Sequence, residues 1–255
     1  MFTLEKAGFR LPEKTLLHAI DMRFEGAGVH GLIGHNGSGK STLLKLLAGQ
    51  LSPTSGRVCF EGRPIGQWDR RRFARRVAYL PQQLPPSEHL TVQELVRFGR
   101  YPWLGLLGRA GARDEAEVER ALALTRTQAY RHRRVDTLSG GERQRVWLAM
   151  LLAQNSQFLL LDEPLAALDI AHQIEVLELI RRLSRELGLG IMLVLHDINL
   201  AARYCDRLVA LHGGRAIAAG TPGDIMSPGC LRAIYGVDVS MVAHPVLGIP
   251  VALVN

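Results

Sequence analysis

Long apolar runs, cysteine and a basic leader are all scarce in this chain of 255 residues. The longest uninterrupted apolar run is Val146 to Ala153, whereas a helix needs about 20 residues to span a bilayer. The start of the chain carries Glu5 and Lys6 instead of a basic segment followed by an apolar block, so we expect no signal peptide. Three cysteines, far apart and odd in number, suit a reducing compartment. The sequence predicts a cytosolic protein that does not cross a membrane alone.

Acidic residues are outnumbered by basic ones, which gives a formal charge of +7. A nucleic acid, an anionic membrane surface or a polyphosphate ligand could each match such a charge. The densest basic segment is DRRRFARR, Asp69 to Arg76, for which we favour a solvated helix face with Phe73 turned inward over a binding patch. Charge alone does not decide between these classes of partner.

The chain does contain a regular alternation of strand-like and helix-like segments. Short strands and turn residues fill residues 1–31, and apolar strands recur later as RVAYL, FLLLDE, IMLVL and RLVAL. Helical spacing is clearest in Ser41 to Gln50, in stretches between Thr91 and Ala153, and from about Ile170 to Leu187. Apolar strands that alternate with helices indicate an α/β fold with a parallel sheet covered on both faces.

The segment GHNGSGKS lies between a predicted strand and a predicted helix and matches a phosphate-binding loop. Glycines let successive backbone N–H groups turn toward phosphates, and the helix N-terminus adds about half a positive charge. We expect Lys40 to meet the β- and γ-phosphates and the Ser41 hydroxyl to bind Mg²⁺. The predicted nucleotide-binding residues here are Gly34, His35, Asn36, Gly37, Ser38, Gly39, Lys40, Ser41 and Thr42.

Two further strands end in polar residues that suit phosphate chemistry. Asp162 and Glu163 follow the apolar strand FLLL, at the sheet edge where ligands bind in α/β folds. Asp162 would reach Mg²⁺, and Glu163 is placed to polarise a water that attacks the γ-phosphate. His196 leaves the end of another buried strand, where a lone histidine is more often structural than catalytic.

The stretch LSGGERQ, Leu138 to Gln144, stands at the start of a predicted helix ahead of the strand that ends in Asp162. Together with GHNGSGKS, LPQQ, LLLDEP and His196 in that order, it resembles the nucleotide-binding subunit of ATP-binding cassette (ABC) transporters. The resemblance covers essentially the whole chain. It implies a P-loop NTPase (RecA-like) core with a mostly parallel sheet, an N-terminal antiparallel β subdomain and an inserted α-helical subdomain.

The resemblance also implies domain limits and residue roles. One nucleotide-binding domain would span residues 1–255, with the helical subdomain at about 88–155 and a C-terminal extension at 222–255. Gln82 would contact the metal and the attacking water, and His196 would contact the γ-phosphate. In this family two copies pair head to tail to form two ATP sites. The residues expected to contact the partner's nucleotide are Ser139, Gly140, Gly141 and Glu142.

Two positions depart from the family pattern. An aromatic residue usually stacks on adenine where this chain has Leu11. Phe9, two residues earlier on the same strand face, could substitute, but we favour Phe9 as a core residue. Base stacking is worth about 1–3 kcal/mol, so its loss would weaken nucleotide binding. Ala166 replaces a serine whose hydroxyl would communicate across the dimer. The strength of nucleotide binding and of coupling between the two sites therefore stays open.

Three further segments are VAYLPQQLPPSEHLTVQELVRFGRYPW, GRAGARDEAEVERAL and VLHDINLAARYCDRLVALHGGRAIAAGTP. They resemble the subfamily that imports iron–siderophore complexes, haem and cobalamin, most closely its ferric hydroxamate (ferrichrome-type) members. This implies an ATPase that powers import through separate integral membrane permease subunits. A substrate-binding protein would be an indirect partner. It would be peripheral on the cytoplasmic side of the inner membrane, with ATP and Mg²⁺ as cofactors and no nucleic acid partner. The alternatives are a haem or cobalamin importer, or a soluble ABC ATPase acting in iron–sulfur cluster assembly or on nucleic acid.

The stretch FGRYPWLGLLGRAG, Phe98 to Gly111, is rich in aromatic and aliphatic residues and falls in the expected helical subdomain. Exposed apolar patches with a polar rim are usually interaction sites. We expect this stretch to contact or support the permease, with Arg100 and Arg109 as its rim. The alternative is a loop that folds Trp103 and Leu106 back onto the helices.

Overall fold

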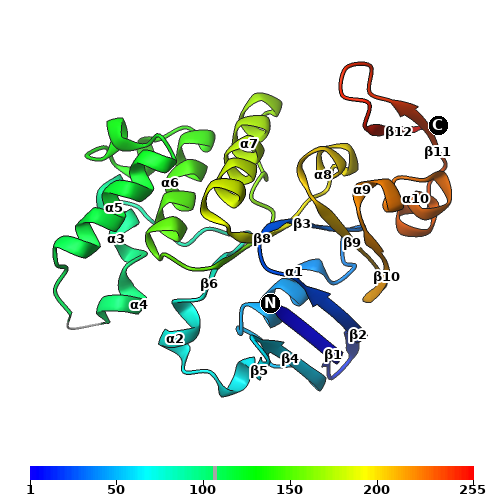
Figure 1. Cartoon of the computed structure of the whole chain (residues 1–255), viewed down its shortest axis with the longest axis horizontal. Coiled ribbons are helices and arrows are strands. Elements are labelled where there is room, and N and C mark those ends of the chain that lie inside the picture. The colour runs from blue at the N-terminus through cyan, green and yellow to red at the C-terminus, as the bar shows by residue number, and fades with distance from the viewer. Residues whose placement is uncertain (106–107) are drawn as a thin grey trace. The chain divides into compact units, whose positions relative to one another are not determined.

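The computed structural model describes residues 1–105 and 108–255 (Figure 1). The chain divides into two compact units. Unit 1 consists of Met1–Trp68 and Gly190–Asn255, and unit 2 is the intervening segment Asp69–Leu189. Leu106, which we expected to pack on the helices if the aromatic stretch is a loop, lies outside the described residues. The limits expected for the helical subdomain, 88–155, and for the C-terminal extension, 222–255, stay predictions.

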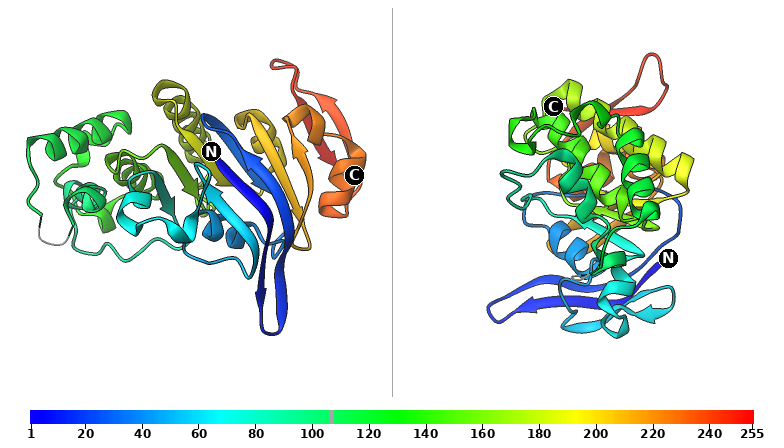
Figure 2. Two further views of the ribbon diagram at one scale, coloured as in Figure 1. Left: turned by 60° about the horizontal axis from the view of Figure 1, so that its bottom comes forward. Right: turned by 90° about the vertical axis from the view of Figure 1, so that its left-hand side faces the viewer.

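Unit 1 begins with an antiparallel sheet, in the order β2-β1-β4-β5. Its strands are β1 (Phe2–Leu11), β2 (Lys14–Phe24), β4 (Ser55–Phe60) and β5 (Arg63–Pro64). Residues Phe2 and Leu4 alternate with more exposed neighbours and are buried, and the Phe2 ring lies 4.7 Å from that of Phe60. The long blue hairpin in Figure 2 is β1 and β2. This sheet confirms the expected N-terminal antiparallel part of the fold.

A second, mostly parallel sheet follows in the same unit. Its central strand β3 (Gly28–Ile33) pairs in parallel with β8 (Gly190–Val194) and β9 (Arg207–His212), and β10 (Arg215–Gly220) runs antiparallel to β9. All residues of β8 and nearly all of β3 are buried, as apolar strands of a parallel sheet should be. The helices of unit 1 are α1 (Lys40–Leu47), α8 (Ile198–Tyr204), α9 (Pro222–Ile225) and α10 (Pro228–Tyr235).

The C-terminal segment forms a hairpin of β11 (Val239–Ala243) and β12 (Pro250–Val254). Asn199 on α8 attaches this hairpin to the rest of unit 1. Its side-chain amide donates to the Ala252 carbonyl over 3.1 Å, and its side-chain oxygen accepts the Ala252 N–H over 2.8 Å. The Asn199 side-chain amide therefore pairs with the backbone of β12 in the way that a neighbouring strand would.

Unit 2 contains a parallel strand pair, β6 (Val77–Leu80) and β7 (Phe158–Leu161), and most of the helices. The helices are α2 (Arg70–Ala74), α3 (Val92–Phe98), α4 (Tyr101–Leu104), α5 (Ala112–Leu124), α6 (Gly140–Ala153) and α7 (Ile170–Leu187). Helices α3, α5 and α6 pack on one another, the green group in Figure 1. Val96, Val118 and Leu148, one from each helix, are fully buried.

The basic segment DRRRFARR forms the short helix α2, and Phe73 is buried as expected. Asp69 caps this helix by accepting the Arg72 N–H over 2.9 Å. Within residues 1–105 and 108–255, no helix has the length and apolar character that crossing a membrane would require.

Candidate nucleotide site and signature segment

The phosphate loop of unit 1 runs from β3 into α1 and is folded around Lys40. This side chain is buried, and its Nζ donates to the carbonyls of Gly34 and His35 over 2.7 and 2.9 Å. Helix α1 begins without a side-chain cap and without an acidic residue in its first turn. The N-terminal N–H groups of α1 therefore present positive potential that no acidic residue of that turn offsets, as phosphate binding requires.

Glycine is required at two positions of this loop. Gly34 has φ +138°, and a Cβ there would lie 2.1 Å from the Leu211 carbonyl oxygen. Gly39, the residue before α1, has φ +102°, and its Cβ would lie 2.6 Å from Leu17 Cδ2. Both conformations are ones that side chains rarely adopt. The loop thus packs directly on β9 and β2 through its glycines.

A histidine pair beside the loop was not anticipated from the sequence. The rings of His35 and His212 lie edge to face with centroids 4.8 Å apart. His212 Nδ1 donates to the Ile234 carbonyl of α10 over 3.0 Å. The segment that follows β9 is also tied to the loop, because Gly214 N–H donates to the Ser38 carbonyl over 3.1 Å. These residues are far apart in sequence, so no local pattern could have linked them.

The acidic residues after β7 lie in unit 2 together with Gln82. Asp162 is 2% exposed, and its N–H donates to the Leu80 carbonyl over 2.9 Å. Gln82 Nε2 donates to Glu163 Oε2 over 2.7 Å. Glu163 has φ +52°, a conformation that costs a non-glycine residue energy and that clusters at functional sites. The structure therefore brings Gln82 and Glu163 together.

Tyr79 on β6 also contacts this group and was not predicted. Its hydroxyl donates to Asp162 Oδ2 over 3.3 Å. Burial raises the pKa of Tyr79 above its usual value, and the negative charge of Asp162 raises it further. Tyr79 therefore stays a neutral donor that helps to orient the Asp162 carboxylate.

His196 follows β8 and its side chain is exposed. The next residue, Asp197, begins α8 by accepting the N–H groups of Asn199 and Leu200 over 2.8 and 3.0 Å. On the other side, Leu195 N–H donates to the Leu32 carbonyl over 3.1 Å, at the end of β3. His196 thus stands between a buried strand and a capped helix at the carboxyl edge of the sheet of unit 1.

The signature segment begins α6 with a capping box. The Ser139 hydroxyl accepts the Glu142 N–H over 3.3 Å, and Glu142 Oε2 accepts the Ser139 N–H over 2.9 Å. The bond from the Ser139 N–H is the main cause that lowers the pKa of Glu142 below its usual value. Ser139 and Gly140 are exposed. The start of α6 is therefore accessible from outside the chain, with the Ser139 N–H bound by Glu142.

Gly141 of the signature contacts the start of α7 through His172, a residue that the sequence analysis did not single out. A Cβ at Gly141 would lie 2.2 Å from His172 Cδ2. His172 Nδ1 donates to Asp169, and its N–H donates to Asp169 Oδ1 over 2.9 Å. The N–H bond is the main cause that holds the pKa of Asp169 below its usual value. The sequence signal that could have identified His172 is its position three residues after Asp169, a spacing typical of a helix N-cap.

The two departures from the family pattern are both visible. Leu11 is 44% exposed and Phe9 is half-buried, and both line a cavity of about 680 Å³ at the end of the β1–β2 hairpin. Ala166 and Ala167 are exposed between Glu163 and Asp169. Both side chains are therefore at least partly accessible at this cavity.

The expectation that Arg100 forms an exposed rim is wrong. Arg100 is 3% exposed, and its guanidinium contacts Asp114 at 2.9 Å and the Ala153 carbonyl at 2.7 Å. Trp103 is half-buried between Arg75 and Arg100, and its Nε1 donates to the Gln154 carbonyl over 2.7 Å. Buried charge is stable only when it is paired in this way. Among the described residues of the stretch, the large apolar side chains that are exposed are instead Phe98 and Tyr101.

The predicted site residues are distributed over both units. Unit 1 carries the phosphate loop and His196, whereas unit 2 carries Gln82, the Asp162–Glu163 pair and the signature segment. The described residues contain no cluster of three His, Cys, Asp or Glu side chains that could hold a metal ion without other ligands. The Ser41 hydroxyl in unit 1 and the Asp162 carboxylate in unit 2 are each a hard oxygen donor of the kind that Mg²⁺ prefers.

Comparison with known proteins agrees with this chemistry. Residues 17–166 match the model of the family described as ABC transporter. The achromobactin transport ATP-binding protein of Dickeya dadantii is 44% identical, over 94% of this chain and 89% of its own length. The iron(3+)-hydroxamate import ATP-binding protein of Bacillus subtilis is 38% identical, over 98% and 93%. Hemin import ATP-binding proteins are among the other relatives.

Solved structures support the fold independently. An inward-facing putative metal-chelate type ABC transporter superimposes with a TM-score of 0.87 and 22% identity, covering 100% of this chain and 97% of that one. The α/β class, with mostly parallel strands, an antiparallel β part and helices, is thereby confirmed. With the family model, the relatives and the fold in agreement, this chain belongs to the ABC transporter family.

Proposed function

We propose that this chain hydrolyses ATP to power the import of an iron–siderophore complex, with a ferric hydroxamate as the cargo, through a separate membrane permease. The observation that carries the proposal is the likeness, along nearly the whole chain, to ATP-binding proteins of achromobactin transport and iron(3+)-hydroxamate import. The chain also carries the residues that ATP hydrolysis needs, in the expected order.

The residues divide the chemistry among them. Lys40 and the N–H groups at the start of α1 bind the β- and γ-phosphates. Glu163 takes the proton of the attacking water, and Gln82 orients the Glu163 carboxylate. His196 contacts the γ-phosphate. Mg²⁺, when held by Ser41, Asp162 and Gln82, would neutralise charge on the phosphates.

A second copy of the chain completes each site in this proposal. The signature segment, Ser139 to Glu142, would contact the γ-phosphate bound by the partner copy, in a head-to-tail homodimer with two ATP sites. Exposure of Ser139 and Gly140 at the N-terminus of α6 supports this role, because the start of a helix favours an anion and both residues can be reached from another chain. ATP then closes the dimer, and hydrolysis opens it.

The other proposed partners are integral membrane permease subunits and, through them, a substrate-binding protein. The chain would be peripheral on the cytoplasmic side of the inner membrane. Nucleic acid is not expected, and contacts within unit 2 support this view. Arg75 Nε donates to the Pro102 carbonyl over 2.9 Å, and the Arg71 guanidinium lies against Gly105. These two arginines of the basic segment serve internal packing.

Iron uptake tests the proposal directly. Cells that lack this chain receive either the wild type or Glu163→Gln, and the uptake of radiolabelled iron is measured with a hydroxamate, a catecholate or haem as carrier. We expect wild type alone to restore uptake, and only with the hydroxamate. Restoration of uptake with the catecholate or haem instead would reject a ferric hydroxamate as the cargo. If no carrier restored uptake, iron import would be rejected as the function.

A further inference from the structure

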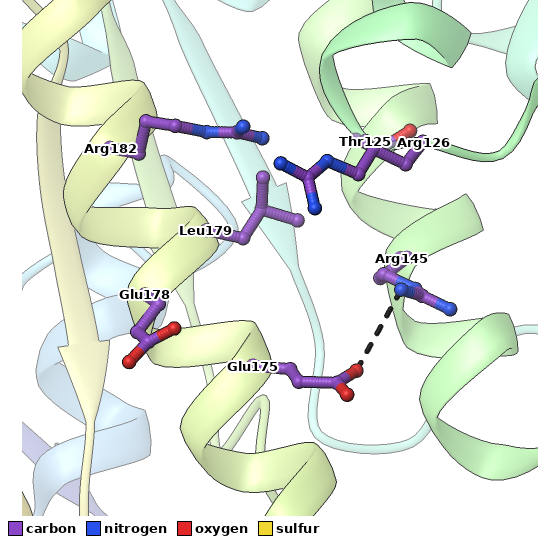
Figure 3. A pocket seen from close by; sticks show the side chains of 7 residues that line it. All are labelled: Thr125, Arg126, Arg145, Glu175, Glu178, Leu179 and Arg182. Atoms are coloured by element: carbon purple, nitrogen blue, oxygen red, sulfur yellow. Dashed lines mark ion pairs between the residues drawn. The ribbon is translucent and has the colours of Figure 1, made fainter.

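A charged cavity of about 310 Å³ lies in unit 2 among residues that the nucleotide chemistry does not use. Figure 3 shows its lining, which comes from α6, α7 and the segment that follows α5. The lining residues are Thr125, Arg126, Arg145, Glu175, Glu178, Leu179 and Arg182. Three guanidinium groups face two carboxylates, so the cavity carries net positive charge.

Arg126 occupies a position where glycine is normally found. Helix α5 ends at Leu124 with Thr125 as its C-cap, and Arg126 follows with φ +55°. The Arg126 N–H donates to the Ala123 carbonyl over 3.1 Å, and the Thr127 N–H donates to the Leu122 carbonyl over 2.9 Å. Such left-handed helix ends favour glycine because a side chain there strains the backbone. The chain therefore keeps a guanidinium here against a backbone preference.

Two of the arginine side chains, Arg126 and Arg182, converge in this cavity. Figure 3 shows the Arg126 side chain extending past Leu179 toward the guanidinium of Arg182. Arg182 is held in place because its Nη2 donates to the Leu124 carbonyl over 2.7 Å. Among residues 1–105 and 108–255, the Arg126 side chain has no hydrogen bond or ion pair. Two cations that point toward each other repel unless an anion lies between them.

The remaining arginine of the cavity has spare hydrogen-bonding capacity. Arg145 lies 3.7 Å from Glu175, which satisfies only part of its guanidinium. The buried Nε atoms of Arg145 and Arg182 have no hydrogen-bond acceptor in the described part of the chain. Buried donors are nearly always satisfied by protein, water or an ion. The cavity thus contains several positively charged hydrogen-bond donors.

We propose that this cavity binds a phosphate group, which Arg126 and Arg182 hold from the end of α5 and from α7. Guanidinium groups bind phosphate oxygens in pairs, with better geometry than an ammonium can offer. Glu175 remains paired with Arg145, and the Glu178 carboxylate limits the affinity. The phosphate comes either from free inorganic phosphate or from a small phosphate monoester, and occupancy ties α5 to α7.

Calorimetric titration of inorganic phosphate tests this site. The full chain is first saturated with a nonhydrolysable ATP analogue, so that the phosphate loop is filled, and ionic strength is kept constant with chloride. We expect one phosphate per chain and a loss of affinity of about tenfold or more in Arg126→Gln. Arg120→Gln removes the same charge from exposed α5 surface and should stay within about twofold of the wild type. Equal binding by wild type and Arg126→Gln would overturn the proposal.

Thermal unfolding of Arg126→Gly provides an independent measurement. Without phosphate this variant should melt about 2–4 °C above the wild type, because glycine relieves the backbone strain. Phosphate should raise the melting temperature of the wild type and not that of the variant. A lower melting temperature of the variant without phosphate would show that Arg126 is structural. Tighter binding of phosphoserine than of phosphate identifies a monoester as the source, the reverse identifies free phosphate, and tighter binding of acetate would reject phosphate.

Discussion

Gln82 and Glu163 are joined by a hydrogen bond of 2.7 Å, from the side-chain amide to the carboxylate. They are 81 positions apart in sequence. Gln82 follows β6 and Glu163 follows β7, and these strands run parallel, so that their carboxyl ends meet at one edge. The contact fixes the oxygen that would accept a proton from water. It also links the segment before α3 to the acidic residue that we assign to catalysis.

Glu163→Gln should therefore retain ATP binding and lose turnover. The variant keeps the size of the side chain but cannot take a proton, and general-base catalysis contributes about 10²–10⁴-fold to a rate. Steady-state hydrolysis and nucleotide binding measure the two effects separately, and ATP should shift the variant to a dimer in gel filtration. Glu186→Gln, on the exposed surface of α7, serves as the control. Full turnover in Glu163→Gln would remove Glu163 from the mechanism.

Gly141→Ala should destabilise the start of α6 through a clash with His172. The added Cβ would lie 2.2 Å from the His172 ring, and overpacking of this kind costs about 1–3 kcal/mol of unfolding free energy. Truncation of the ring in the double variant Gly141→Ala/His172→Ala should recover most of that loss. Urea unfolding of the two single variants and the double variant gives the coupling. Strict additivity of the two changes would mean that the contact is not the cause.

The predictability of the site differs between its parts for a physical reason. The phosphate loop, the Asp162–Glu163 pair and the signature are local patterns, because backbone turns and helix caps depend on neighbouring residues. Arg100 was misplaced because its partners are Asp114 and the Ala153 carbonyl, the latter 53 positions away. The contact of His172 with Gly141 and that of His35 with His212 were missed for the same reason. Alternation of apolar strands and helices predicted the fold class, since burial on both faces is itself a sequence property.

His30 should make stability fall as pH is lowered. Burial is the main cause that holds its pKa below the usual value of 6.5. Below pH 6.5, His30 binds a proton in the unfolded chain more readily than in the folded chain. The unfolding free energy therefore decreases as pH falls. The contribution is complete above about pH 6.5 and is lost toward and below the lowered pKa. Urea unfolding between pH 5 and 7 measures this slope.

The matched variants for that experiment are His30→Gln, which cannot titrate, and His132→Gln, which removes an exposed histidine. We expect a flatter pH dependence for the first and an unchanged one for the second. If His30→Gln kept the wild-type slope between pH 5 and 7, other groups would have to account for it.

The aromatic stretch after α3 separates into a packed part and an exposed part, and variants can test each. Trp103→Ala removes the hydrogen bond to Gln154 and the stacking of Arg75 and Arg100 on the indole, at 4.8 and 5.1 Å. We expect a loss of about 2–4 kcal/mol of unfolding free energy. This is somewhat less than the cost of truncating a fully buried tryptophan to alanine, because Trp103 is half-buried. Permease binding by this variant would change only as far as folding does.

Phe98 and Tyr101 are 56% and 53% exposed, so the double variant Phe98→Ser/Tyr101→Ser should leave stability within about 0.5 kcal/mol of the wild type. If this surface contacts the permease, the double variant should lose co-purification with permease subunits while basal hydrolysis persists. Exposed aromatic residues contribute strongly to protein interfaces, which is why two substitutions suffice. Wild-type co-purification of the double variant would assign the stretch to packing alone, through Trp103.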